Sequence, residues 1–240
     1  MNNQMNNQNY YTGFGERELA QQAALPALMR KVYTWMSLAL VITAIAAYGT
    51  ATSGLAYTIA ANPLLFWGLI IGELALVFGV SAGINKLSIT TATLLFVLYS
   101  VINGVTLSFI FFAYTMASIA KVFFITAATF GVMAVYGYTT KTDLSKMGKI
   151  LFMALIGLII AVVVNIFVKS TMFDLVISCV GVLIFVGLTA WDTQKIKAML
   201  YQAEPGSETT QKIALMGALS LYLDFINLFI YLLRLLGRRD

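Results

Sequence analysis

The chain has 240 residues, of which 60% are hydrophobic and 10% charged, and its formal net charge is +5. Soluble globular domains carry about 25% charged residues, so this composition excludes a water-soluble domain. The chain has no histidine and a single cysteine, Cys179, which excludes an internal disulfide, Ser–His or Cys–His catalysis and histidine-based zinc sites.

Apolar runs of about 20 residues, the length that crosses a hydrocarbon core of roughly 30 Å, recur along the chain. They predict an all-α, polytopic membrane protein with seven transmembrane helices, because the alternating segments of a transmembrane barrel are missing. The third run is long enough to predict tilt or an interfacial extension. Short connections predict one compact bundle of antiparallel neighbours. The expected spans are residues 32–51, 64–84, 88–114, 117–138, 150–168, 172–190 and 213–233.

The polar ends divide the chain into three parts. Residues 1–29 are rich in Asn and Gln and lack the pattern of a signal peptide, so we interpret them as a flexible, polar, cytoplasmic tail. Residues 30–237 form the seven-helix transmembrane domain, and residues 238–240 form a basic C-terminal tail. The broken helices of small-solute transporters are not predicted, because every proline falls outside the expected spans: Pro26, Pro63 and Pro205.

The distribution of Lys and Arg predicts an N-terminus inside the cell. That orientation places most basic residues on the inner side: Arg30, Lys31, Lys86, Lys141, Lys146, Lys149, Lys195, Lys197 and Lys212. Lys121 and Lys169 fall outside, and a full crossing by the last span also sends Arg234 and Arg238 outside. The net charge follows from this topology and from attraction to anionic lipid. Nucleic-acid binding is not predicted, because the sequence contains no basic stretch interleaved with aromatic residues.

Three carboxylates lie within or at the edge of apolar spans: Glu73, Asp192 and Asp224. A charge at mid-helix costs about 2.5–3.5 kcal/mol on insertion scales, so each is expected to have a role. Asp224 lies about 16 Å along the last span, at 1.5 Å per residue. Its helix face is polar at intervals of 4, 3 and 4 residues, through Ser220, Asp224, Asn227 and Tyr231. Such a face must meet protein or a water-filled cavity, as a seam between helices or as an ion path.

Glu73 and Asp192 each leave two interpretations open. Glu73 lies beside four glycines whose spacing predicts close packing against another helix: Gly68, Gly72, Gly79 and Gly83. We therefore expect Glu73 to point into the bundle, either as a buried neutral group or as part of the ion path. Asp192 is either a helix-end surface charge paired with Lys195, or a working carboxylate at the inner edge of the membrane.

Four motifs carry a family resemblance: "GLTAWDTQKIK" (187–197), "SLYLDFINLFIYLLRLLG" (220–237), "ELALVFGVSAGINKLS" (73–88) and "VLYSVINGVTLSFIFFAYT" (97–115). With them the chain resembles the Bax inhibitor-1 family of membrane proteins over about residues 20–237. The resemblance implies six helices around a central seventh and, for bacterial members, a place in the inner membrane. It also implies a pH-dependent calcium leak in which Asp192 and Asp224 form the proton sensor and gate.

The chemistry of two aspartates agrees with that implication. Two carboxylates close together in a low-dielectric site cannot both ionise cheaply, so they share a proton. The doubly ionised pair attracts a divalent cation, and Ca²⁺ suits carboxylate and carbonyl oxygens. Asp192 and Asp224 are therefore the candidate Ca²⁺ ligands, with Ca²⁺ as the transported ion and no resident cofactor. The family's basic latch on the second span is replaced by Gly83, which leaves Lys86 as a candidate latch.

Three functions remain open. The favoured one is a pH-gated calcium leak channel or Ca²⁺/H⁺ exchanger, with a path through Glu73, Ser220, Asn227 and Tyr231. The second is an interaction protein that modulates a membrane protease or another quality-control partner through its polar tail. The third is an intramembrane aspartyl protease, which also needs two facing carboxylates. Asp224 follows "LYL" rather than the Gly-x-Gly of those enzymes, so we expect no enzymatic activity.

Overall fold

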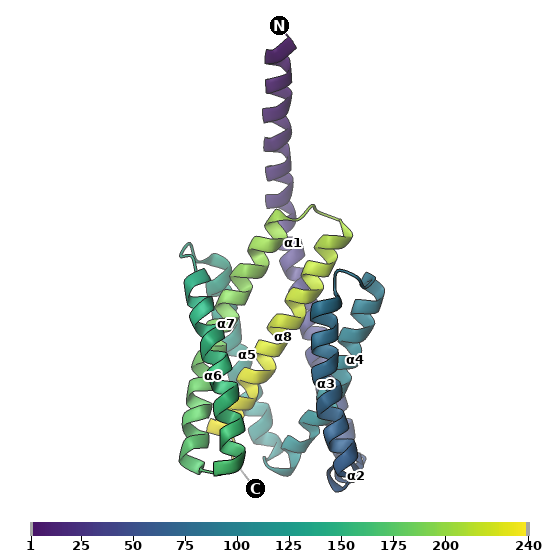
Figure 1. Cartoon of the computed structure of the whole chain (residues 1–240), viewed down its shortest axis with the longest axis vertical. Helices are drawn as coiled ribbons and strands as arrows, with labels where there is room; N and C mark the ends of the chain where they lie inside the picture. The colour runs from purple at the N-terminus through teal and green to yellow at the C-terminus, as the bar shows by residue number, and fades with distance from the viewer. Residues whose placement is uncertain (1, 239–240) are drawn as a thin grey trace.

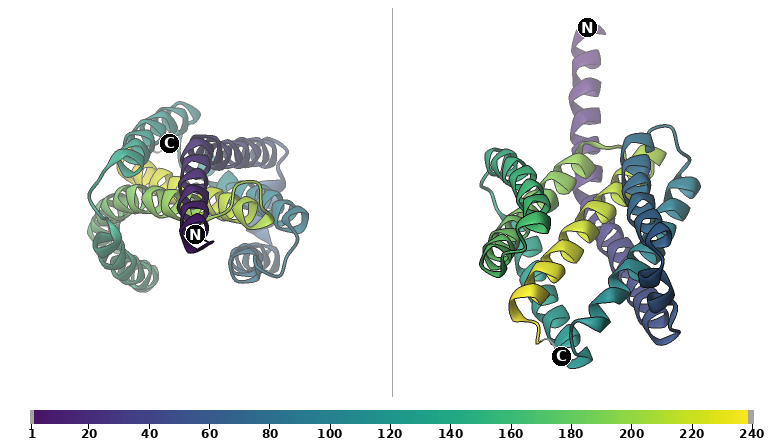
Figure 2. Two further views of the ribbon diagram at one scale, coloured as in Figure 1. Left: turned by 90° about the horizontal axis from the view of Figure 1, so that it is seen from above. Right: turned by 60° about the horizontal axis from the view of Figure 1, so that its bottom comes forward.

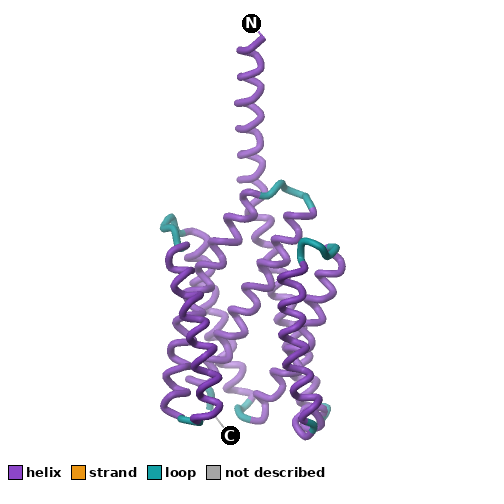
Figure 3. Tube along the Cα trace, viewed as in Figure 1, coloured by secondary structure: helices purple, strands orange, loops and turns teal. Residues whose placement is uncertain are grey.

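In the computed structural model, the backbone is described for residues 2–238 and the side chains for residues 19–238. Every regular element in this part is a helix (Figures 1 and 3). Seven of the helices are long and apolar enough to cross a membrane, which confirms the predicted fold class. In chain order the elements are α1 (Asn2–Thr52), α2 (Leu55–Ala61), α3 (Pro63–Gly83), α4 (Ile89–Leu107), the 3₁₀ turn η1 (Ser108–Phe112), α5 (Met116–Thr139), α6 (Ser145–Val168), α7 (Thr171–Gln202) and α8 (Glu208–Leu236).

Helix α8 is the central helix of the bundle. It is the most buried of the seven and packs against α7, α1, α5 and α4. Seen from above in Figure 2, its yellow ribbon runs through the middle of the bundle. Its sequence explains this position, because apolar residues surround the helix on nearly all sides between Leu221 and Leu233. Helices α3 and α6 are peripheral, with few buried residues.

The expected spans match the seven long helices, although α6 begins at Ser145 and α8 at Glu208, each about five residues before the expected start. Helix α7 continues to Gln202, well beyond residue 190, because Ile196 and Leu200 keep burying an apolar face. The extension expected for the third span is the turn η1. The short helix α2 was not predicted, since its seven residues are too few to show a period.

The N-terminal segment differs from the expectation of a flexible tail. Helix α1 begins at Asn2 and projects beyond the other helices (Figure 1). Pro26 lies inside this helix and within its apolar stretch Leu19–Thr52, so the prediction that all prolines fall outside spans was wrong. A proline removes one backbone N–H from the helix, and membrane helices tolerate this where neighbouring groups compensate.

The two chain ends lie at opposite ends of the bundle (Figure 1). Helix α8 runs for 29 residues and is long and apolar enough for a full crossing. Arg234 and Arg238 consequently lie at the C-terminal end, away from the loops that hold Lys86 and Lys141.

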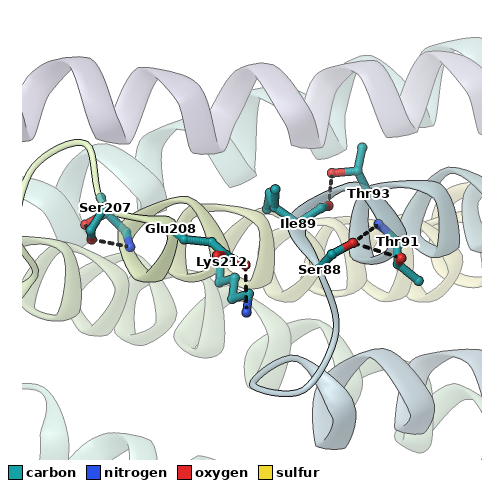
Figure 4. A network of polar contacts seen from close by, with 8 residues as sticks. Ser88, Ile89, Thr91, Thr93, Ser207, Glu208 and Lys212 are labelled. Atoms are coloured by element: carbon teal, nitrogen blue, oxygen red, sulfur yellow. Dashed lines mark hydrogen bonds and ion pairs between the residues drawn. The ribbon is translucent and has the colours of Figure 1, made fainter.

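Serine caps fix the first turns of α4 and α8 at the N-terminal end of the bundle (Figure 4). Ser88 Oγ accepts a hydrogen bond from the Thr91 amide at 3.1 Å, and Ser207 Oγ accepts one from the Thr210 amide at 3.1 Å. Such caps stabilise a helix by about 1 kcal/mol each. One turn into α8, Lys212 pairs with Glu208 at 3.0 Å.

The glycines of α3 do not form the predicted close-packing face. A Cβ added at Gly68, Gly72 or Gly79 would meet no atom within 4 Å, so no neighbouring helix packs closely against these positions. The close approaches lie elsewhere. Gly137 of α5 lies against the backbone of Ala190, and Gly148 of α6 lies against the Trp191 ring. Two neighbouring helices therefore press on α7 immediately before Asp192.

Candidate functional site

Asp192 of α7 and Asp224 of α8 meet at the centre of the candidate site. Their carboxyl groups are near enough for each to act on the other. Asp224 is 5% exposed, and its Oδ2 atom is buried with no hydrogen-bond partner among the described residues. A carboxylate only accepts hydrogen bonds, so a hydrogen bond between the two groups requires a proton on one of them. The structure thus brings together the two aspartates that the sequence singled out.

The packing of α8 on α7 aims Asp224 at its partner. Two turns further along α8, Tyr231 packs its ring on Gly181 of α7 and stacks on Phe185 at 5.8 Å between ring centroids. Residues 224 and 231 are seven apart and share one helix face. The polar face of α8 therefore turns toward α7, as its spacing predicted.

A cavity of about 390 Å³ leads to Asp192 from the N-terminal end of the bundle. Asp192 lines this cavity, whereas Asp224 lies behind it. The pair therefore has one member at a polar cavity and one sealed in the bundle. The polar residues that line the cavity are Asn85, Asp192, Lys195, Thr209, Lys212 and Ser220.

Lys195 is the basic residue that acts on the pair. Its charge acts on Asp192 from one turn further along α7, and its Nζ atom lies 4.9 Å from the centroid of the Trp191 ring. Asp192 thus has both neighbours that the sequence offered as alternatives, Lys195 and Asp224. Lys86 is exposed in the loop between α3 and α4 and does not line the cavity, so its role as a latch stays a prediction.

The other members of the α8 polar face lie in different surroundings. Ser220 lines the cavity near Asp192. Asn227 donates from Nδ2 to the carbonyl of Leu223 at 2.8 Å, within its own helix. Tyr231 is buried under Arg234, whose guanidinium lies 5.6 Å from the ring centroid. An ion path along this face stays a prediction.

Glu73 belongs to a second buried polar group, on α3, α4, α1 and α8. Its carboxyl lies beside Thr106, and its Oε1 atom is buried without a partner of good geometry among the described residues. It also acts on the hydroxyls of Tyr99 and Tyr222. The Tyr222 hydroxyl donates to Asn103 Oδ1 at 3.0 Å and lies 2.7 Å from Thr43 Oγ1. Glu73 points into the bundle as predicted, toward Tyr222 rather than toward the aspartate pair.

A third polar contact joins α7 and α8 at the C-terminal end. Arg234 Nη1 lies 3.4 Å from Asp174 Oδ1. A cavity of about 360 Å³ adjoins this ion pair and is also lined by Asn165, Lys169 and Ser178. No local pattern in the sequence indicated this pairing, because the two residues lie 60 positions apart.

The donor set around the pair suits a passing cation better than a resident metal. Among the residues that the structure describes, no three His, Cys, Asp or Glu side chains form a cluster. Ca²⁺ takes 6–8 oxygen ligands in folded proteins. Two carboxylates supply only part of that shell, so water and carbonyl oxygens would have to complete it.

Comparisons with known proteins identify a family and several relatives. The family described as "Inhibitor of apoptosis-promoting Bax1" matches residues 25–240. The inner membrane protein YbhL of Escherichia coli K12 is 49% identical over 220 residues, which cover 91% of this chain and 94% of YbhL. A protein of Borreliella burgdorferi is 48% identical, covering 88% of this chain and 91% of its own length. Protein RP147 of Rickettsia prowazekii is 43% identical, covering 88% and 89%.

Proposed function

The chain belongs to the Bax inhibitor-1 family of integral membrane proteins, and we propose that it is a pH-dependent calcium leak channel or Ca²⁺/H⁺ exchanger gated by Asp192 and Asp224. We further propose that it lies in a bacterial inner membrane with its N-terminus in the cytoplasm. The similarity to an inner membrane protein supports the first point. The basic residues gathered at the N-terminal end support the second.

The contact between Asp192 and Asp224 is the observation that carries the proposal. With a proton on the pair, the two carboxyls hold α7 and α8 together through a hydrogen bond. Without it, two negative charges face each other across a poorly solvated gap, so they repel each other and attract a divalent cation. Proton binding then favours one of two arrangements of α7 and α8, which is the requirement for a switch.

The two aspartates have different roles in the proposed gate, because one is accessible from a cavity and the other is buried. Asp192 lines the cavity at the proposed cytoplasmic end, so water, protons and cations reach it from that side. Asp224 is buried on the central helix, so its ionisation acts on the packing of the whole bundle. Lys195 beside Asp192 opposes cation binding in the closed arrangement and is displaced by a cation when the pair opens.

Calcium flux from vesicles that contain the purified protein tests the proposal. We expect the flux to change by up to about tenfold per pH unit while a single shared proton titrates, because one pH unit changes a protonation ratio tenfold. The measurement is the release of trapped Ca²⁺ from liposomes between about pH 5 and about pH 8, against liposomes loaded with Ca²⁺ but lacking the protein. An imposed proton gradient that drives Ca²⁺ uphill identifies an exchanger, and a purely downhill flux identifies a leak. A flux equal to that of empty liposomes at every pH contradicts the proposal.

A second function is favoured by the projecting start of α1. We propose, as the alternative, that this segment contacts a membrane protease or another membrane protein, because its helix extends beyond the bundle (Figure 1) and its sequence is rich in Asn and Gln. Deleting residues 2–18 is then expected to abolish co-purification with the partner while leaving vesicle Ca²⁺ flux within about twofold. Unchanged co-purification after the deletion contradicts the alternative without touching the calcium proposal.

A further inference from the structure

A long groove runs between α1 and α5, with Phe225 of α8 at its floor. Its wider part has a volume of about 1070 Å³ and extends along α1 from Pro26 to Ala44. A narrower part of about 300 Å³ continues toward the C-terminal end and shares Leu40, Phe123 and Phe225 with the first. We call both parts together the α1–α5 groove. The wider part alone extends for about 27 Å along α1, at 1.5 Å per residue, which is close to the hydrocarbon thickness of a bilayer.

The α1–α5 groove faces the bilayer rather than water. Its rim includes Leu38, Val41 and Val135, which are 48%, 56% and 64% exposed. These residues lie in the membrane-spanning parts of α1 and α5, so the exposed surface meets lipid. The floor is aromatic, with Phe225 of α8 at 5.4 Å from Phe123 and 5.5 Å from Phe130 between ring centroids.

Charge is confined to one end of the α1–α5 groove. Arg30 is the charged side chain among the residues that line it, and it forms no ion pair with any described residue. Lys197 stands next to this end, where it donates to the Tyr138 carbonyl at 2.7 Å and lies over the Tyr138 ring. No acidic side chain of the described part of the chain lines the groove, and its narrow end is uncharged.

From this arrangement we propose that the α1–α5 groove holds an anionic phospholipid of the surrounding bilayer, with its acyl chains on the aromatic floor and its phosphate at Arg30. An occupant with a long apolar body and one negatively charged end matches a groove that is apolar along its length and positive at one end. Guanidinium groups bind phosphate oxygens through paired, charge-assisted hydrogen bonds. A transmembrane helix of a partner fits less well, because the cytoplasmic ends of such helices are enriched in Lys and Arg. This last argument rests on the orientation proposed above.

Gly131 provides a sharp test of the site. It lines the groove, and a Cβ added there would meet no atom within 4 Å, so a large side chain can enter the groove without disturbing the fold. Gly157 of α6 is equally open but does not line the groove, which makes Gly157→Phe a matched control. Lys31 is exposed beside Arg30 and does not line the groove, so Lys31→Gln controls for Arg30→Gln.

The experiment measures phosphatidylglycerol bound to the detergent-purified full chain by native mass spectrometry. We expect wild type and Gly157→Phe to retain the lipid, and Gly131→Phe to retain about tenfold less. Arg30→Gln is expected to weaken phosphatidylglycerol binding about tenfold, an effect that Lys31→Gln does not show, because Arg30 lines the groove and Lys31 does not.

Equal retention by Gly131→Phe and Gly157→Phe overturns the proposal. A disulfide-linked dimer formed by cysteines placed at positions 38 and 135 also overturns it, since it assigns the groove to a second copy. Lipid retention is measured without ion flux, so its outcome is independent of the proposed calcium function.

Discussion

Asp224→Asn is expected to give a calcium flux that no longer depends on pH and that equals the wild-type flux at the acidic end of the profile. The asparagine amide donates a hydrogen bond to Asp192, as the protonated pair does, and cannot lose its proton. The doubly ionised state is therefore removed and the packing of α8 on α7 is kept. Because the side chain is buried at a helix contact, we expect at least a tenfold difference from wild type at the alkaline end of the profile.

The control for this variant is Asp143→Asn, the same change at an exposed carboxylate. Asp143 Oδ1 accepts a hydrogen bond from the Ser145 amide at 2.9 Å, and the hydrogen bonds from Ser145 lower the pKa of this carboxyl. The Oδ1 atom of asparagine accepts the same hydrogen bond from the Ser145 amide, so the fold is kept. Asp192→Asn should also flatten the profile, since it too leaves a single carboxyl. Wild-type pH dependence in both Asp192→Asn and Asp224→Asn would remove the basis of the proposed gate.

Gly137→Ala is expected to destabilise the protein, although the same substitution normally stabilises a helix. An added Cβ would overlap the carbonyl of Ala190, and its backbone C and Cα atoms would lie at 2.9 Å. Because these are backbone atoms, α5 has to move away from α7, at a cost of about 1–3 kcal/mol. At roughly 2–4 °C per kcal/mol, the midpoint of thermal unfolding should fall by about 2–12 °C.

Gly131→Ala in the same helix is the matched control. Its Cβ meets open space, so the better helix propensity of alanine should stabilise the protein by up to about 1 kcal/mol. Thermal unfolding of both variants in detergent, followed by tryptophan fluorescence, measures the two effects. Shifts of the same sign in both variants would show that α5 does not press on α7 at Gly137. Since Ala190 lies two residues before Asp192, Gly137→Ala should also alter the pH profile of the flux.

The fold could be predicted from local patterns, whereas the aspartate pair also needed the family resemblance. Apolar length defined the spans because the bilayer imposes one thickness on every crossing. The intervals between Ser220, Asp224, Asn227 and Tyr231 predicted one polar face of α8, since the helical period is fixed. Asp192 was undecided from its surroundings alone, and the family resemblance paired it with Asp224. The contact between the two carboxyls agrees with that pairing, and their role as a gate remains our proposal.

Predictions that depended on which helix lies next to which were less accurate. Glycine spacing suggested a packing face on α3, whereas the close approaches lie at Gly137 and Gly148. The spacing of glycines shows that one face of a helix lacks large side chains, but a peripheral helix can turn that face to lipid. The ion pair of Asp174 with Arg234 and the contact of Glu73 with the Tyr222 group were also missed. Each joins residues far apart in the sequence, for which no local pattern exists.

The sequence by itself determined that this protein is a seven-helix membrane protein and that Asp192 and Asp224 are its unusual carboxylates, because the cost of charge in hydrocarbon acts on each residue separately. Only the tertiary structure decided that Asp192 opens to a cavity while Asp224 is sealed, and that α1 and α5 leave a groove with Arg30 at one end. Those features depend on how helices pack around α8, and packing is a property of several distant segments together.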